Sequence, residues 1–278
     1  MILHRSLLTA GFALGAAAAS AQEAMHTQAA TMPSPGTFVL RQMLHYTEFG
    51  SNASAGLEST EQYRWTSALQ FGVARDWSLL VDVPVMFRDD EPLGGGGDSD
   101  AGVGDIDILA KWRFYRDDSG GINTSRAALI FGARVASGDD SDFSSQSVNP
   151  TIGGVYTVVR GRHGFNQDLF YRLNTGGDPD HNFGGESTDD AFLHNSSWVY
   201  RIFPRQYTSD TEGAWYSTVE LSGIYEFSGD YEARGSAGVM YEGRRWAIEA
   251  MVQLPLIDEL DERAEMDLAV GFGLRFTF

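Results

Sequence analysis

His194 and Ser196 stand two residues apart and are the pair in this sequence best suited to covalent chemistry. A histidine beside a serine can act as the general base that activates the hydroxyl, and residues two apart share one face of a strand. A third group that would orient the imidazole is missing, because the outward residues expected on the next strand are Trp215, Ser217 and Val219. The sequence therefore predicts a polar belt here rather than an enzyme.

The sequence gives weaker evidence for a metal-binding or a phosphate-binding site. Met25, His26 and Met32 could capture a soft metal ion, but they follow no ligand spacing. The acidic residues 139–142 do not match a twelve-residue calcium loop, and no Gly-Lys-Ser or Gly-Lys-Thr follows the glycines 94–97. The chain has no cysteine, which excludes disulfides and thiolate sites. We expect no cofactor and no metal ion.

The charge balance argues against a nucleic-acid partner. The formal net charge is -18, and affinity for phosphate backbones comes from Lys and Arg. The acids cluster in the segments 89–91, 98–100, 139–142 and 178–190. These clusters indicate solvated loops.

The first residues have the pattern of a signal peptide. His4 and Arg5 form a short basic region, residues 7–19 form an apolar stretch too short to span a membrane, and residues 19–21 are small. We expect cleavage before Gln22, so that residues 1–21 are a signal peptide.

Alternation along the last residues indicates a β-strand of unusual length. From Met266 to Phe278 the even positions are all apolar, whereas the odd positions are small, polar or charged. Such a strand can face lipid with one side and a lumen with the other. Phe276 and the terminal Phe278 are expected to serve as the C-terminal signal for the barrel assembly machinery.

Eleven further segments show related alternation, and their lengths of about 11 to 14 residues exceed the roughly 5 to 6 of soluble strands. We therefore predict an all-β fold, a transmembrane antiparallel up-and-down β-barrel of about twelve strands over residues 37–278, in the outer membrane. Tight turns alternate with long acidic loops, which places both chain ends in the periplasm. The expected strands are 37–48, 61–74, 77–87, 104–115, 125–136, 150–160, 164–174, 190–203, 214–226, 231–242, 245–256 and 265–278.

Charged residues on the opposite strand face should line the lumen, because a lone charge in hydrocarbon costs about 2 to 4 kcal/mol near the midplane. Residues 22–36, with Pro33 and Pro35, are expected either to tuck into the barrel as a small plug or to form a periplasmic tail. The expected lumen-lining residues are Asp82, Asp105, Asp107, Lys111, Arg113, Arg126, Arg134, Asp168, Arg172, Glu220, Arg234, Glu249, Asp267 and Arg275.

One stretch carries a family resemblance. Residues 101–114, which read AGVGDIDILAKWRF, together with residues 79–84 and 271–278, resemble the outer-membrane transporters of the phenol meta-pathway degradation family. The resemblance implies a barrel that passes small aromatic or otherwise hydrophobic molecules. It implies no catalytic residues.

These observations favour a passive channel or transporter for small molecules, with a narrow path and a preference for cations or neutral solutes set by the acidic loops. Its expected partners are outer-membrane lipid, lipopolysaccharide and the solute. Two alternatives stay open. One is a lipid hydrolase using His194 and Ser196, whose spacing is similar to that of outer-membrane phospholipases and lipid A deacylases, and the other is a closed structural barrel.

Overall fold

The computed structural model describes residues 23–51, 56–139, 143–176, 189–261 and 264–278. The predicted signal peptide, residues 1–21, lies outside the described residues. Within these ranges, no helix is long and apolar enough to span a membrane.

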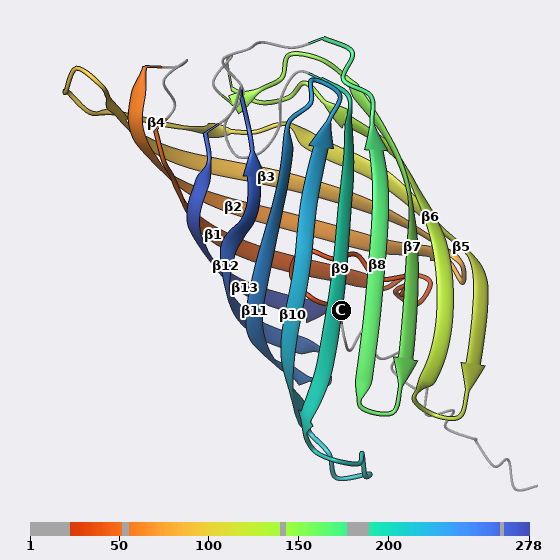
Figure 1. Ribbon diagram of the computed structural model, residues 1–278. Coiled ribbons are helices and arrows are strands. Elements are labelled where there is room, and N and C mark those ends of the chain that lie inside the picture. Colours follow the sequence, from red (N-terminus) through yellow and green to blue (C-terminus); the bar gives the residue numbers. More distant parts are fainter. Residues whose placement is uncertain (1–22, 52–55, 140–142, 177–188, 262–263) are drawn as a thin grey trace, which may run out of the picture.

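The chain forms one closed antiparallel barrel (Figure 1). The first and last strands close it, because residues 39–49 pair with residues 266–277. Two consecutive strands, β4 and β5, pair in turn with β3, so the strands occupy 12 positions around the wall. The strands are β1 (Phe38–Phe49), β2 (Leu57–Ala74), β3 (Trp77–Pro92), β4 (Asp98–Val103), β5 (Ile106–Ser119), β6 (Asn123–Val135), β7 (Asn149–Arg160), β8 (His163–Arg172), β9 (Ala191–Phe203), β10 (Gly213–Glu226), β11 (Tyr231–Gly243), β12 (Trp246–Glu259) and β13 (Met266–Thr277).

Residues 88–102, predicted to be a long loop, are instead mostly a hairpin. β3 continues to Pro92, and β4 pairs with its outer half from Val85 to Asp90. Gly95 and Gly96 make the turn with φ values of 76° and 96°, a region that glycine adopts at little cost. This hairpin carries charges on both faces, so the apolar alternation that marks the other strands is absent.

The outer surface of the barrel is apolar around its waist. Leu169, Val252, Leu254 and Phe272 stand on the outside with 43 to 52 % of their surface exposed. Aromatic rings gather at the rim with the short turns, where Trp77 stacks on Trp112 and Trp215 and Trp246 flank Tyr241. An apolar waist with an aromatic girdle is the outer surface of a membrane barrel.

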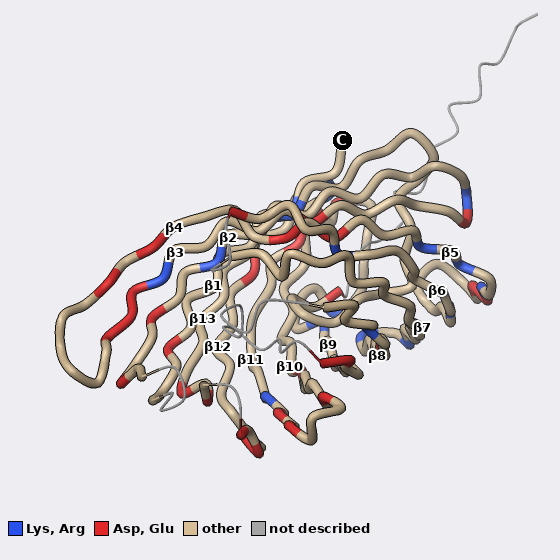
Figure 2. The backbone as a smooth tube through the Cα atoms, turned by 90° about the horizontal axis from the view of Figure 1, so that it is seen from above, with Lys and Arg blue, Asp and Glu red and all other residues tan. Residues whose placement is uncertain are grey.

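Charge differs between the two ends of the barrel. Seen from above, acidic residues gather on the β3–β4 hairpin and on neighbouring loop ends (Figure 2). The tight turns at the opposite rim carry arginines instead, at positions 75, 160, 162, 244 and 245. Since long loops are extracellular and short turns periplasmic in such barrels, the extracellular rim is acidic, whereas the periplasmic rim carries these arginines together with Asp76, Asp117 and Asp118.

We predict that Val252→Arg destabilises the folded barrel by about 2 to 4 kcal/mol, because it places a cation against acyl chains near the midplane. Urea titration of folding into lipid vesicles measures this change. Leu93→Arg, in the exposed turn of the β3–β4 hairpin, is the control and should change stability by less than about 0.5 kcal/mol. Equal effects of the two substitutions would contradict the assignment of the outer face to lipid.

Candidate functional site

The lumen contains a segment of the chain itself. Residues 23–36, which we call the inner segment, run as irregular coil inside the barrel before β1 begins (Figure 1). The segment reaches the periplasmic rim at Gly36, whose N–H donates to the carbonyl of Gly72 at 2.8 Å. Pro33 and Pro35 lack the backbone N–H that strand pairing needs.

Glu220 on β10 binds the inner segment most extensively. Its carboxylate accepts hydrogen bonds from the backbone N–H groups of Met25 at 2.9 Å, His26 at 3.0 Å and Thr27 at 2.9 Å, and from the Thr27 hydroxyl at 2.8 Å. The Glu220 side chain is buried. Because several donors converge on one carboxylate, this short stretch of the segment is fixed in place.

The next residues of the segment are bound by other strands. Gln28 donates its N–H to Asp168 on β8 at 2.7 Å, and Ala30 donates to the Thr157 hydroxyl on β7 at 2.8 Å. In the other direction, the Lys111 ammonium on β5 donates to the carbonyl of Ala29 and the side-chain oxygen of Gln28, both at 3.0 Å. The wall therefore satisfies both donors and acceptors of the irregular backbone.

Apolar contacts fix the two ends of the same stretch. Ala24 packs in a cluster with residues from β9 to β12, including Tyr216 and Met240. Ala30 and Met32 pack with Ile130 and other residues of β6 and β7. These clusters lie against different parts of the wall, so the inner segment crosses the lumen between them.

Ion pairs surround the start of the segment. Arg41 on β1 bonds to Glu249 at 2.7 Å and donates to the carbonyl of Ala24 at 2.8 Å. Arg275 on β13 lies 3.4 Å from Glu23. Since these groups are largely shielded from water, the pairs offset the cost of placing charge inside the barrel.

The residues predicted to line the lumen occupy several environments. Lys111, Asp168, Glu220 and Arg275 contact the inner segment directly, and Glu249 acts through Arg41. Others form ion pairs elsewhere along the wall: Asp107 with Arg134, Arg234 with Glu232, Arg113 with Asp76, and Arg126 with Asp118. Asp82 and Arg172 lie on inward positions of β3 and β8.

Three predicted positions lie away from this network. Asp267 is exposed near the start of β13. A register shift in the pairing of β1 with β13, between Glu48 and Phe49, reverses the faces here, so Met266 is buried instead of facing lipid. Phe276 is exposed on the outer surface, and Phe278 stacks on Phe38 with ring centres 5.8 Å apart. The role of these phenylalanines in assembly stays a prediction.

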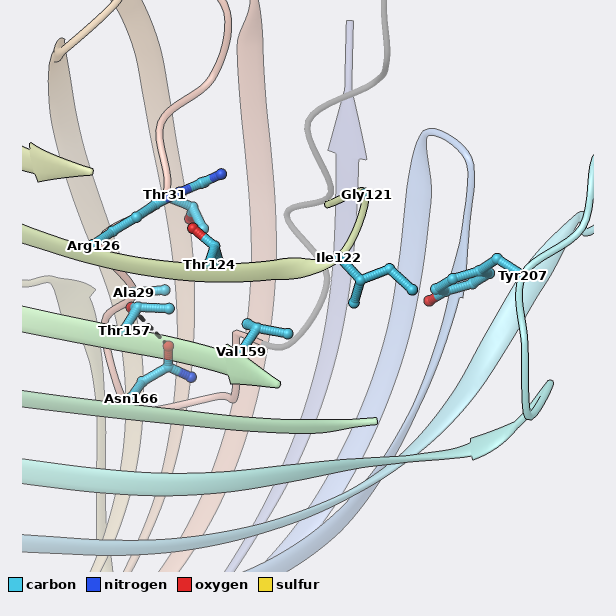
Figure 3. A pocket seen from close by; sticks show the side chains of 10 residues that line it. All are labelled: Ala29, Thr31, Gly121, Ile122, Thr124, Arg126, Thr157, Val159, Asn166 and Tyr207. Atoms are coloured by element: carbon cyan, nitrogen blue, oxygen red, sulfur yellow. Dashed lines mark hydrogen bonds between the residues drawn. The ribbon is translucent and has the colours of Figure 1, made fainter. Parts of the chain in front are cut away.

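A cavity of 160 Å³ lies on the periplasmic side of the inner segment (Figure 3). Ala29 and Thr31 of the segment form one part of its lining, and Tyr207 from the β9–β10 loop faces Ile122 across it. Arg201 lies over the Tyr207 ring at 4.0 Å from its centre. The remaining wall is mixed in polarity and consists of Gly121, Thr124, Arg126, Thr157, Val159 and Asn166.

Asp105 organises the extracellular side. Its carboxylate accepts hydrogen bonds from the N–H groups of Ser137, Gly138 and Ser145 at 2.8 to 3.1 Å and from the Ser145 hydroxyl at 2.6 Å. Burial alone would raise the pKa of Asp105, but the hydrogen bonds from serine and backbone groups outweigh it and hold the pKa below its usual range. The β6–β7 loop is thereby docked against the start of β5.

The glycines of the AGVGD stretch make room for this docking. A Cβ on Gly102 would lie 2.3 Å from the ring of Phe143, so a larger residue there would displace the ring. Arg88 covers the same ring at 5.6 Å from its centre. The stretch that carries the family resemblance is thus a docking site for an extracellular loop.

Sequence reasoning missed several residues of the site. Arg41, His45 and Thr157 face the lumen, as the alternation within the expected strands 37–48 and 150–160 could have shown. Tyr207 lies in a periplasmic loop with no periodic pattern, so no sequence signal could place it at the cavity.

His194 and Ser196 both lie on the outer face of β9. The His194 ring is directed to Tyr231, with Nε2 3.4 Å from the hydroxyl oxygen. Ser196 lies in an apolar depression beside Trp198 and Leu221. The structure thus gives His194 a tyrosine partner rather than the serine.

Comparisons with known proteins identify the fold. No protein-family model matches the sequence, and no curated protein sequence matches it significantly. An outer membrane channel from Pseudomonas putida is structurally similar, with a TM-score of 0.59 and 12% identity over 92% of this chain and 100% of that one. The β-domain of a Bordetella autotransporter (TM-score 0.48, 12% identity, 88% and 100% of the two chains) and the NanC porin (0.47, 11%, 85% and 98%) are less similar. Together with the closed wall and its apolar waist, the first likeness shows an outer-membrane β-barrel.

We predict that Glu220→Ala frees the inner segment. A hydrogen bond to a charged group contributes about 1.5 to 3 kcal/mol, so the amides of Met25 and Thr27 should exchange with solvent about ten- to hundredfold faster. Amide hydrogen exchange in detergent measures this rate. Glu61→Ala, at an exposed position of β2, should leave the rates unchanged. Equal protection in Glu220→Ala and the wild type would contradict the role of this carboxylate.

Asp105→Asn should loosen the β6–β7 loop, because an amide cannot accept hydrogen bonds at both of its polar atoms. Exchange of the Gly138 and Ser145 amides should accelerate, whereas Asp98→Asn in the hairpin should have no such effect.

Lowering the pH should also loosen the β6–β7 loop. Since the pKa of Asp105 is lowered in the folded state, its contribution is complete above the ordinary aspartate pKa of about 3.9 and is lost as the pH falls below it. Loop loosening already at pH 6 would contradict this account.

Proposed function

We propose that this chain is a channel that passes small solutes across the outer membrane and that the inner segment constricts its lumen. The observation that supports this most is the set of bonds from Glu220, Asp168 and Lys111 to residues 25–30. These bonds hold the segment across the lumen by side chains of the wall rather than by strand pairing. Loss of these bonds would therefore release the segment without opening the wall, which closes through β1 and β13.

The cavity beside the segment suggests the solute class. Its volume of 160 Å³ is close to that of a cavity of about 150 Å³ that holds a single benzene ring. Ile122, Val159 and Tyr207 provide apolar surface. Thr124, which bonds to Asp118, and Asn166, which bonds to Thr157 and Ser197, provide polar surface. We propose small aromatic or otherwise hydrophobic solutes with a polar group, in agreement with what the family resemblance implies.

The acidic extracellular hairpin supports a preference among solutes. Asp90 lies directly opposite Asp98 across β3 and β4, and Asp89, Glu91 and Asp100 lie near this pair on the same two strands. A negative mouth raises the local concentration of cations and repels anions. We therefore propose that cations and neutral molecules enter more readily than anions.

We propose that the remaining expected partners act at the surfaces of the barrel. Lipopolysaccharide would contact the outer loops, and the assembly machinery would contact the C-terminal strand that carries Phe276 and Phe278.

Planar-bilayer recording tests the proposal. The wild type should show small, cation-selective conductance, and the double substitution Glu220→Ala with Asp168→Ala should raise the conductance severalfold because the inner segment is released. Glu61→Ala is the matched control and should behave as the wild type. The absence of conductance in all three would favour a closed structural barrel, and anion selectivity would contradict the role of the acidic mouth.

Solute class is tested by liposome swelling. Phenol-sized neutral solutes should enter faster than disaccharides, and the double substitution should reduce the difference. Phospholipid hydrolysis that is lost in Ser196→Ala would instead support an enzyme.

A further inference from the structure

Two histidine rings lie side by side inside the barrel. His26 belongs to the inner segment and His45 to β1, and their ring centres are 5.2 Å apart. The Nε2 atoms of both rings are buried, and neither has a hydrogen-bond partner in the part of the chain that the structure describes. A buried ring nitrogen without a partner is costly, so a pair of them needs an explanation.

Two methionine side chains lie at the same place. Gly271 on β13 is directly opposite His45. The Sδ of Met25 lies 2.6 Å, the Cε of Met251 2.7 Å and the Cδ2 of His45 3.1 Å from the position that a Cβ would take at residue 271. The Met25 sulfur, the Met251 methyl group and the His45 ring edge therefore surround one point beside Gly271. The glycine provides the space in which these groups converge.

We propose that His26, His45, Met25 and Met251 form a binding site for a soft monovalent metal ion of the Cu⁺ class. Thioethers are soft ligands that select Cu⁺, and imidazole also binds copper. The site would take two ligands from the inner segment and two from the wall. A bound ion would therefore tie the segment to the barrel.

The ring geometry fits a shared ion. Imidazole nitrogens bind metal ions such as zinc at about 2.0 to 2.1 Å, which puts two rings at a tetrahedral angle roughly 5 Å apart between centres. The measured separation is 5.2 Å.

Ligand type favours a monovalent soft ion over Zn²⁺ or Ca²⁺, because two of the four side chains are thioethers. The surrounding charge has both signs, since Arg41 and Arg64 act on His45 and Glu220 and Glu249 act on His26. Among the residues that the structure describes, no three His, Asp or Glu side chains converge as a metal site. Met32, the third residue of the motif singled out in the sequence, lies elsewhere, because its sulfur accepts a hydrogen bond from Ser78 at 3.2 Å.

Binding of Ag⁺ to the full-length purified protein tests the site. Ag⁺ is a redox-stable probe for Cu⁺ chemistry, and the chain has no cysteine that would bind it. Equilibrium dialysis with elemental analysis should find one tightly bound ion per chain. His45→Gln and Met25→Leu should each weaken binding at least about tenfold, the loss that perturbing a metal site typically causes. Met32→Leu and His194→Gln are matched controls and should bind as the wild type does.

A second measurement separates loss of the site from loss of the fold. With isotope-labelled methionine methyl groups, Ag⁺ should shift the NMR signals of Met25 and Met251 and leave that of Met32 in place. Gly271→Ala, which removes no ligand, should weaken binding because its methyl group displaces the Met25 sulfur. Unchanged affinity in His45→Gln, or no shift of the Met25 signal in the folded wild type, would overturn the proposal.

Discussion

An irregular peptide can lie inside a barrel only if its backbone N–H and C=O groups find partners there, because an unsatisfied buried polar group costs free energy. The inner segment meets this constraint with side chains of the wall. Glu220, Asp168 and Thr157 accept its N–H groups, and Lys111 donates to its carbonyl and amide oxygens. The relation is reciprocal, since a buried carboxylate such as Glu220 would itself be costly without these donors. Segment and wall therefore stabilise each other.

The closure of the barrel wall does not depend on the inner segment. The wall closes through backbone pairing between β1 and β13, which involves no residue of the inner segment. The segment is attached through a few side-chain bonds and two small apolar clusters. Releasing the segment therefore breaks fewer hydrogen bonds than opening the wall, and local openings of lower cost are drawn from such elements. A rigid wall with movable contents is the physical basis of the proposed channel, and the soft-metal site would add a bond between the two.

The strands were largely predictable, and the lumen contents were not. Alternation predicted strand 214–226 to within one residue of β10. It did so because every second side chain of such a strand faces lipid and must be apolar, while the side chains between them face the lumen. The β3–β4 hairpin was missed because it projects beyond the membrane, where neither face needs to be apolar. The inner segment has no period at all, and its main partner, Glu220, is 195 residues from Met25. Sequence could predict that charges face inward, but not which of them bind the segment.

The proposed channel depends on residues 23–36 lying in the lumen, and disulfide trapping tests this most directly because the chain has no cysteine of its own. Ala30 packs in one cluster with Val155, whereas Ala247 belongs to the cluster around Ala24. Oxidation of Ala30→Cys with Val155→Cys in membranes should give an intramolecular crosslink in high yield, and Ala30→Cys with Ala247→Cys should not. Equal crosslinking of both pairs, or of neither, would show that the segment does not occupy this position.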